Sequence, residues 1–216
     1  MNDRPSEVTA ADIAQLLREI DKAALRLDKH RDEVLDIEEI SAATGIRPGR
    51  VRELLAGAEP EQEPRVRELR EEFYRRLVSQ RLDDLRKKGN PASPTGDSYR
   101  AIGSEVNLTH TLVEFLVKGR RSARPEYSSP LEKHYGVDHG FLSKLEGEAL
   151  ADRLTETRDA LHAGALLEGL QVLGGGEVAA LRQTEAAAPS LGDLVEVMDA
   201  LVARKRIRDR KEAAGS

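Results

Sequence analysis

The chain has 216 residues, of which 39% are hydrophobic and 34% are charged, a balance that favours a folded protein with a charged surface over a disordered chain. It contains no cysteine, which excludes disulfides, zinc–thiolate sites and cysteine nucleophiles. Aromatic residues make up only 3%, so stacking platforms for single-stranded nucleic acid are not expected.

The formal net charge of −5 is unevenly distributed along the chain. Residues 1–63 carry 9 basic and 15 acidic side chains, whereas residues 64–125 carry 14 basic and 8 acidic side chains, a net charge of +6. The acidic average therefore does not exclude a local positive surface. The first residues, MNDRPSEVTAAD, do not form a signal-peptide pattern, and no run approaches 18 apolar residues. We therefore expect a cytoplasmic protein without a membrane span.

Helical spacing dominates the sequence and no segment alternates like a strand, which predicts an all-α fold. Residues 1–63 are predicted to form an N-terminal helical domain. Its first helix is expected to begin after Thr9, a suitable N-cap. The apolar side chains of this helix recur at steps of three and four and define its buried face: Ile13, Leu16, Leu17, Ile20, Ala24 and Leu27.

A helix-turn-helix pattern follows at residues 36–57. Its first helix is expected to end at Gly45, and its second to begin at Pro48, which suits a first helical turn. The inward-facing side chains of the second helix are expected to be Val51, Leu54 and Leu55. The pattern fits an ordinary helical hairpin as well as a second DNA reader, and its acidic residues (Glu38, Glu39 and Glu53) favour the hairpin or a role in protein contact.

Residues 64–147 are predicted to form a central domain, preceded by a polar linker with two prolines at residues 58–64. A long basic helix is expected from Arg65 to Lys88, followed by a loop rich in turn residues at 89–97. The inner side chains predicted for the basic helix are Leu69, Phe73, Leu77, Leu82 and Leu85.

The most informative segment spans residues 98–142. Asn107 and Leu108 are expected to form a tight turn between two short helices, and Thr109 to cap the second of them. The inner side chains of the two helices are expected to be Ile102, Val106, Leu112, Val113 and Leu116. A third short helix is predicted to carry Leu131 and Tyr135 and to end at Gly136, and Phe141 and Leu142 are expected to close the unit. Two short helices joined this way can place the second one in the major groove of a DNA duplex.

This segment resembles the helix-turn-helix of Cro and lambda-repressor (Xre-type) regulators. It shares with them a small helix, a turn that ends in Thr109, a second helix, a Gly-Arg pair followed by a proline, and the closing phrase HYGVDHGFL. Residues 73–210 resemble, more specifically, the EspR-type DNA-binding regulators of actinobacteria, which share the proline- and glycine-bearing loop and a helical C-terminal extension. The resemblance implies a five-helix domain that binds double-stranded DNA sequence-specifically. It also implies a transcription regulator or nucleoid-associated regulator that acts as a homodimer.

The resemblance also implies a role for each exposed residue around the second helix. His110 and Thr111 stand where side chains contact bases, and Glu114 and Phe115 occupy the next positions. Phe115 could touch a thymine methyl group or pack inward. Lys118, Arg120 and Arg121 match the end of the family's second helix that contacts phosphates. The candidate DNA-binding residues are Tyr99, Arg100, Thr109, His110, Thr111, Glu114, Phe115, Lys118, Arg120, Arg121 and Arg124.

Residues 148–216 are predicted to form a C-terminal helical dimerisation domain. One helix is expected from Glu148 to about Leu173, where residues 174–176, all glycine, would end it, and another from about Ser190 to Arg210. The apolar stripe predicted as the dimer interface comprises Leu191, Leu194, Val195, Met198, Leu201 and Val202. An apolar surface on the preceding helix (Leu161, Leu166, Leu167, Leu170, Val172 and Leu173) could instead pair with this stripe in an intramolecular bundle.

Catalysis is not expected, because the five histidines show no metal-ligand spacing and no set of residues indicates a nucleophile. We likewise predict no metal and no cofactor. The alternative to DNA binding is a helix-turn-helix module that binds protein, such as a sigma factor, a toxin or a secretion component. The acidic N-terminal domain would suit such a protein partner.

Overall fold

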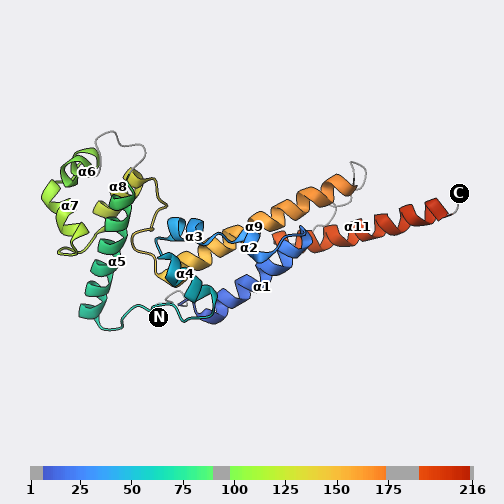
Figure 1. Cartoon of the computed structure of the whole chain (residues 1–216), viewed down its shortest axis with the longest axis horizontal. Coiled ribbons are helices and arrows are strands. Elements are labelled where there is room, and N and C mark those ends of the chain that lie inside the picture. The colour runs from blue at the N-terminus through green and yellow to red at the C-terminus, as the bar shows by residue number, and fades with distance from the viewer. Residues whose placement is uncertain (1–6, 90–97, 174–189, 215–216) are drawn as a thin grey trace. The chain divides into compact units, whose positions relative to one another are not determined.

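The computed structural model describes residues 7–89, 98–173 and 190–214. These residues form ten helices and connecting loops, with no strand among them, so the all-α prediction is confirmed for this part of the chain. The helices, labelled in Figure 1, are α1 (Ala10–Arg26), α2 (Arg31–Val34), α3 (Ile37–Thr44), α4 (Pro48–Leu55), α5 (Arg67–Lys88), α6 (Tyr99–Glu105), α7 (His110–Val117), α8 (Pro125–Tyr135), α9 (Glu146–Leu173) and α11 (Leu191–Ala214). None of them combines the length and apolar character that crossing a membrane requires.

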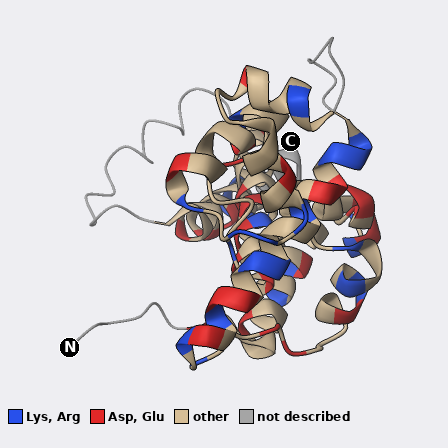
Figure 2. Ribbon diagram, turned by 90° about the vertical axis from the view of Figure 1, so that its left-hand side faces the viewer, with Lys and Arg blue, Asp and Glu red and all other residues tan. Residues whose placement is uncertain are grey.

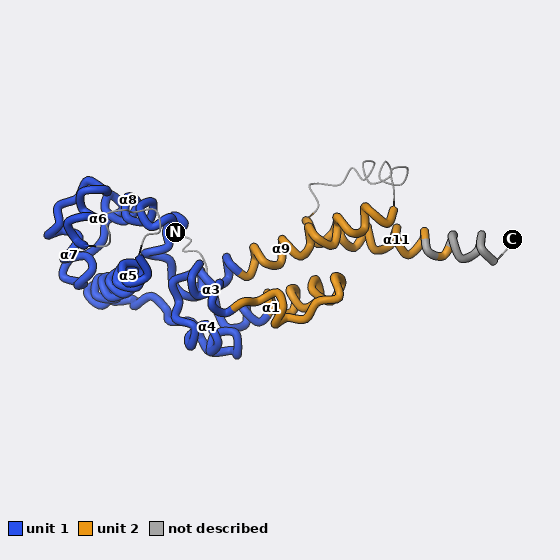
Figure 3. Tube along the Cα trace, turned by 45° about the horizontal axis from the view of Figure 1, so that its top comes forward, with its two compact units in different colours: residues 1–14, 37–153 blue, residues 15–36, 154–216 orange. Residues whose placement is uncertain are grey.

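The chain divides into two compact units, each assembled from two separate stretches of sequence. The first unit contains the chain up to Ala14 and Ile37–Arg153, and the second contains Gln15–Asp36 and the chain from Leu154 onwards. Helices α1 and α9 therefore each belong partly to both units, as the colours of Figure 3 show. These boundaries differ from residues 63 and 147, where a proline-bearing linker and the start of a new helix predicted the domain ends. Composition detects polar linkers, but it cannot detect a continuous helix that two units share.

The first unit contains a core formed by α5, α6, α7, α8 and the segment that follows α8. The buried side chains of this core are Val78, Leu82, Ile102, Val113, Leu116, Val117, Leu131, Phe141 and Leu142. The inward faces predicted for the two short helices are thus confirmed, with Val106 and Leu112 half-buried against the same core. Gly136 ends α8 in the left-handed conformation, as its position predicted.

The predicted inner face of α5 is confirmed in part: Phe73 and Leu82 are buried, and Leu77 and Leu85 are half-buried. Leu69, expected to be buried, is 55% exposed, whereas Val78 and Arg81 are buried. Leu69 lies one turn before Phe73, the first buried residue of the helix. The apolar spacing therefore predicted the helical period, but it did not indicate where the helix enters the core.

The helix-turn-helix pattern at residues 36–57 is present as α3 and α4. The turn begins at Gly45, whose positive φ of 70° is a conformation that glycine adopts without strain. Pro48 starts α4, and Val51 and Leu54 are fully buried, as predicted. Leu55 is half-buried.

The predicted linker at residues 58–64 is a packed segment. Pro60 is buried, and a Cβ added at Gly147 would lie 3.0 Å from the Cβ of Pro60. The amide of Glu61 donates to Glu146 Oε1 at 2.6 Å, and Arg50 donates to the Glu59 carbonyl at 2.8 Å. Its polar composition reflects hydrogen bonding to α4 and α9, and does not indicate a free connection.

The second unit packs parts of α1 and α9 against α11. Arg158 on α9 donates to Glu19 on α1 at 2.9 Å, and Arg26 on α1 contacts Asp199 on α11 at 3.1 Å. Its buried apolar side chains are Leu17, Ile20, Ala23, Ala24, Leu35, Leu154, Leu161, Leu173, Val195 and Met198. Much of the predicted apolar face of α1 is thus confirmed. Residues 174–176, expected to break the helix, lie outside the described residues.

Candidate nucleic-acid interface

The turn between α6 and α7 is held by two caps and a close helix approach. Ser98 caps α6 by accepting from the Ala101 amide at 3.1 Å, and Thr109 caps α7 by accepting from the Leu112 amide at 3.3 Å. A Cβ at Gly103 would lie 2.6 Å from the carbonyl oxygen of Leu108. Because a side chain there would collide with backbone, this glycine fixes how closely α6 packs on the turn. Asn107 completes the turn with a φ of 56°.

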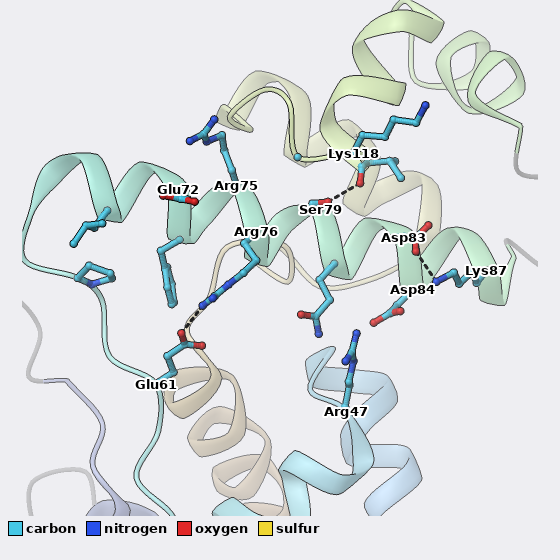
Figure 4. A pocket seen from close by; sticks show the side chains of 16 residues that line it. Arg47, Glu61, Glu72, Arg75, Arg76, Ser79, Asp83, Asp84, Lys87 and Lys118 are labelled. Atoms are coloured by element: carbon cyan, nitrogen blue, oxygen red, sulfur yellow. Dashed lines mark hydrogen bonds and ion pairs between the residues drawn. The ribbon is translucent and has the colours of Figure 1, made fainter.

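Helix α7 is also fixed at its far end. The Ser79 hydroxyl on α5 donates to the Val117 carbonyl at 2.6 Å, an interaction drawn in Figure 4. This bond occupies a carbonyl in the last turn of α7, which has no partner within its own helix. Sequence reasoning did not predict the role of Ser79, because a serine within a polar stretch gives no signal of its contact. Helix α7 is therefore positioned at both ends.

The outer face of α7 presents several of the predicted DNA-binding residues. His110 and Thr111 are exposed in its first turn, next to the exposed cap Thr109. One turn later, Glu114 and Phe115 are half-buried. The start of α7 therefore presents polar side chains that a ligand can reach.

Lys118 is engaged within the protein. It forms an ion pair with Glu114, one helical turn earlier. The hydrogen bond from Lys118 holds the pKa of Glu114 below its ordinary value. The pair contributes little net charge, so Lys118 offers less to a phosphate than an isolated lysine would.

Three arginines follow α7 and stay accessible. Arg120, Arg121 and Arg124 are exposed, and Arg124 precedes the first turn of α8. The guanidinium of Arg121 lies 5.7 Å from the centre of the Tyr127 ring, a cation–π distance that leaves its N–H groups available. Within the described residues, none of the three has a carboxylate within 4.0 Å. Arg120 acts on the Glu114 carboxylate at longer range, but none of the three arginines is held in an ion pair among the described residues.

The two candidates at the start of α6 differ from each other. Arg100 is exposed. Tyr99 is half-buried against the core, and the guanidinium of Arg86 lies 5.5 Å from the centre of its ring. The contact with Arg86 was not predicted, because the two residues are separated by the loop.

The second helix-turn-helix pair, α3–α4, has a different charge environment. Arg50 forms ion pairs with Glu53 at 3.0 Å and with Glu146 at 2.6 Å, and these contacts raise its pKa. Arg52 lies 3.6 Å from Glu38. Two of the basic side chains on α4 are thus already balanced by carboxylates.

A groove of about 840 Å³ runs along α5 (Figure 4). Both acidic and basic side chains line the groove. Two ion pairs form within it: Arg76 with Glu61, and Lys87 with Asp83. Figure 2 shows the same mixture on a larger scale, with basic and acidic positions interspersed along the ribbon. In the described part of the chain, no group of three His, Asp or Glu side chains could hold a metal ion.

The predicted dimer stripe on α11 is partly covered within its own chain. Val195 and Met198 are buried, and a Cβ at Gly169 on α9 would lie 2.4 Å from Met198. Leu194, Leu201 and Val202 are half-buried, and Leu191 is 39% exposed. Val195 and Met198 therefore belong to an intramolecular bundle, the alternative left open by the sequence.

No family model matches the chain, and no curated protein or solved structure shows a significant similarity to it. The Xre-type and EspR-type resemblance thus remains a prediction from the residues.

Proposed function

We propose that this protein is a transcription regulator or nucleoid-associated regulator that binds double-stranded DNA sequence-specifically as a homodimer. Helix α7 would enter the major groove, with His110 and Thr111 toward base edges. The proposal is carried by the exposed start of α7 together with Arg120, Arg121 and Arg124, which follow the other end of the helix. None of these arginines has a carboxylate within 4.0 Å among the described residues. Side chains and helix ends of this kind bind phosphates and set the register of a protein on a duplex.

The test compares two triple variants that change the net charge equally. Replacing Arg120, Arg121 and Arg124 by Gln should make the plot of log K against log salt less steep. The magnitude of its slope should fall by about 2 to 3, because each phosphate contact contributes about 0.9 to that magnitude. The control replaces the exposed residues Lys22, Lys29 and Lys133 by Gln and should leave the slope unchanged. Fluorescence anisotropy with a labelled duplex measures both. If the salt slope falls equally in the two variants, the DNA interface does not lie at Arg120, Arg121 and Arg124.

Base reading is tested separately by replacing His110 and Thr111 by Ala. Each good base contact contributes roughly 1–3 kcal/mol of discrimination, so the variant should bind preferred and random duplexes with similar affinity. Its salt slope should remain that of the unmodified protein. If the variant keeps its sequence preference, α7 is not the reading helix.

The homodimer rests on the part of the α11 stripe that stays accessible. Replacing Leu191 and Leu194 by Asp should give a folded monomer by light scattering, because charges are strongly disfavoured in an apolar interface. Ala200→Asp with Ala203→Asp adds the same charge at exposed positions of α11 and should remain dimeric. An unmodified protein that is monomeric at tens of micromolar would refute the dimer.

One observation favours the alternative function, a helix-turn-helix module that binds protein. The carboxylates around α4 already balance Arg50 and Arg52, so this pair has less charge to offer a duplex. If the full chain does not retard any duplex at low salt, the protein-binding function replaces the DNA-binding one.

A further inference from the structure

A buried arginine without a carboxylate partner lies on α5. Arg81 is only 2% exposed, and its Nη1 donates to the carbonyls of Phe141 and of Lys144, the latter at 2.8 Å. No carboxylate among the described residues lies within 4.0 Å of it, and its Nε has no acceptor among the described protein atoms. Burial lowers the pKa of Arg81 to about 10. The carboxylate of Glu146 acts on Arg81 at longer range and balances part of its charge. A buried charge that forms no ion pair and leaves one N–H unsatisfied is costly, so this site calls for an explanation.

Arg81 lines a cavity of about 280 Å³ between the α3–α4 turn and the C-terminal half of α5. The basic side chains around this cavity are Arg47, Arg81, Lys87 and Lys88, and the acidic one is Asp84. Lys87 is engaged by Asp83, whereas Arg47 and Lys88 are exposed and have no carboxylate within 4.0 Å in the described ranges. In Figure 4, Arg47 extends from the start of α4 toward α5, on the side of Asp84. The charged side chains around the cavity are therefore mostly basic, with Asp84 as the one acidic lining residue among those described.

The walls of the cavity hold the Arg81 guanidinium in place. It lies 5.7 Å from the centre of the Phe141 ring. A Cβ at Gly45 would lie 2.8 Å from that ring and 3.2 Å from Arg81 Nε, so the α3–α4 turn packs directly on both. Fixed donors cost little reorganisation when a ligand binds.

We propose that this cavity is a binding site for a small anion that carries a phosphate or carboxylate group. Arg81 supplies the charge at its base, and Arg47 and Lys88 supply charge at its rim. Guanidinium groups suit both ligand groups because they offer paired N–H donors. The volume lies near the lower end of ligand sites in proteins, which fits a small metabolite rather than a macromolecule. The proposal does not depend on DNA binding.

The test measures thermal unfolding of the full chain by circular dichroism, in potassium phosphate, in potassium citrate and in potassium chloride at matched ionic strength. A ligand at about ten times its Kd should raise the midpoint by roughly 3–6 °C for a chain of this size. Phosphate tests binding of a phosphate group, and citrate tests binding of carboxylate groups. Isothermal titration calorimetry gives the number of ligands bound per chain. The expected result is saturable stabilisation by at least one of them, with one site per chain.

The variant replaces Arg47 and Lys88 by Gln, which removes rim charge from exposed positions and leaves the buried Arg81 in place. Its midpoint should no longer rise with phosphate or citrate. The control, Lys22→Gln with Lys133→Gln, changes the charge equally at exposed positions away from the cavity and should keep the full shift. Three results would overturn the proposal: no difference from chloride, equal shifts in variant and control, or competition by duplex DNA for the same site.

Discussion

The pairs α3–α4 and α6–α7 differ in how their basic residues are balanced. On α4, Arg50 contacts Glu53 and Glu146, and Arg52 lies near Glu38. After α7, three arginines remain without a carboxylate within 4.0 Å among the described residues. A phosphate that approaches Arg50 or Arg52 must compete with these carboxylates, whereas a phosphate that approaches Arg120, Arg121 or Arg124 displaces no ion pair among the described residues. The comparison shows that two segments with the same helix-turn-helix pattern can differ in how their basic side chains are paired.

The two turns also use glycine differently. In α3–α4, Gly45 supplies the positive φ of the turn itself. In α6–α7, Asn107 takes the positive φ, and Gly103 lies inside the first helix, where it makes room for the backbone of the turn. Both turns therefore contain a residue with positive φ, and the α6–α7 turn depends in addition on a close approach at Gly103.

The largest effect is expected at Gly103. Its replacement by Ala would place a Cβ 2.6 Å from a backbone oxygen and should cost about 2–4 kcal/mol of unfolding free energy. Gly49→Ala in α4 meets nothing within 4 Å and should be neutral or stabilise by up to about 1 kcal/mol. The unfolding free energies of the two variants are measured by urea unfolding, monitored by circular dichroism. Equal changes would show that a side chain is tolerated equally well at the two positions.

Removing Glu146 should give the next largest effect. Glu146→Ala leaves the Glu61 amide without its acceptor and removes one partner of Arg50, at a cost of about 1–2 kcal/mol after allowance for the partial exposure of Arg50. Duplex affinity should stay unchanged, because α7 is not involved. A variant of normal stability with altered DNA affinity would mean that α3–α4 takes part in binding.

Ser79→Ala should have a smaller effect on stability but should affect binding. It removes the donor to the Val117 carbonyl and should cost about 1 kcal/mol. Because it releases one end of α7, sequence preference should weaken more than salt dependence does. Anisotropy with preferred and random duplexes at two salt concentrations separates these quantities.

The smallest effect is expected at Glu114. Its pKa is held below the ordinary value, so mild acid leaves it ionised, and Glu114→Gln is the direct way to release Lys118 at neutral pH. The salt slope should then steepen by about one. The matched change on the other pair, Glu38→Gln, releases Arg52 and should leave the slope as it was. A steeper slope for Glu38→Gln would identify α4 as a second DNA reader.

Local signals predicted local structure well. Thr9, Thr109 and Pro48 mark helix starts where their chemistry indicates, and Gly45 and Gly136 mark helix ends. These features depend on a few adjacent residues, so a sequence contains enough information to predict them.

Features that depend on distant segments could not be predicted. The burial of Arg81 depends on carbonyls more than 55 residues away, and the balance of Arg50 depends on Glu146. Tyr99, one of the predicted DNA-binding residues, is half-buried against the core, with the guanidinium of Arg86 5.5 Å from the centre of its ring. In each case the deciding contact joins residues that no local spacing relates.

The packing of residues 58–64 affects how this chain responds to proteolysis and to truncation. A protease requires its substrate to leave the fold as an extended strand, and exposed, weakly bonded loops are therefore cleaved first. Here the Glu59 carbonyl and the Glu61 amide are both engaged, and Pro60 is buried. Brief digestion should spare this segment despite its polar composition. A chain shortened to begin after residue 63 would expose Gly147 and the Glu146 carboxylate, so its behaviour would report a damaged unit rather than an isolated domain.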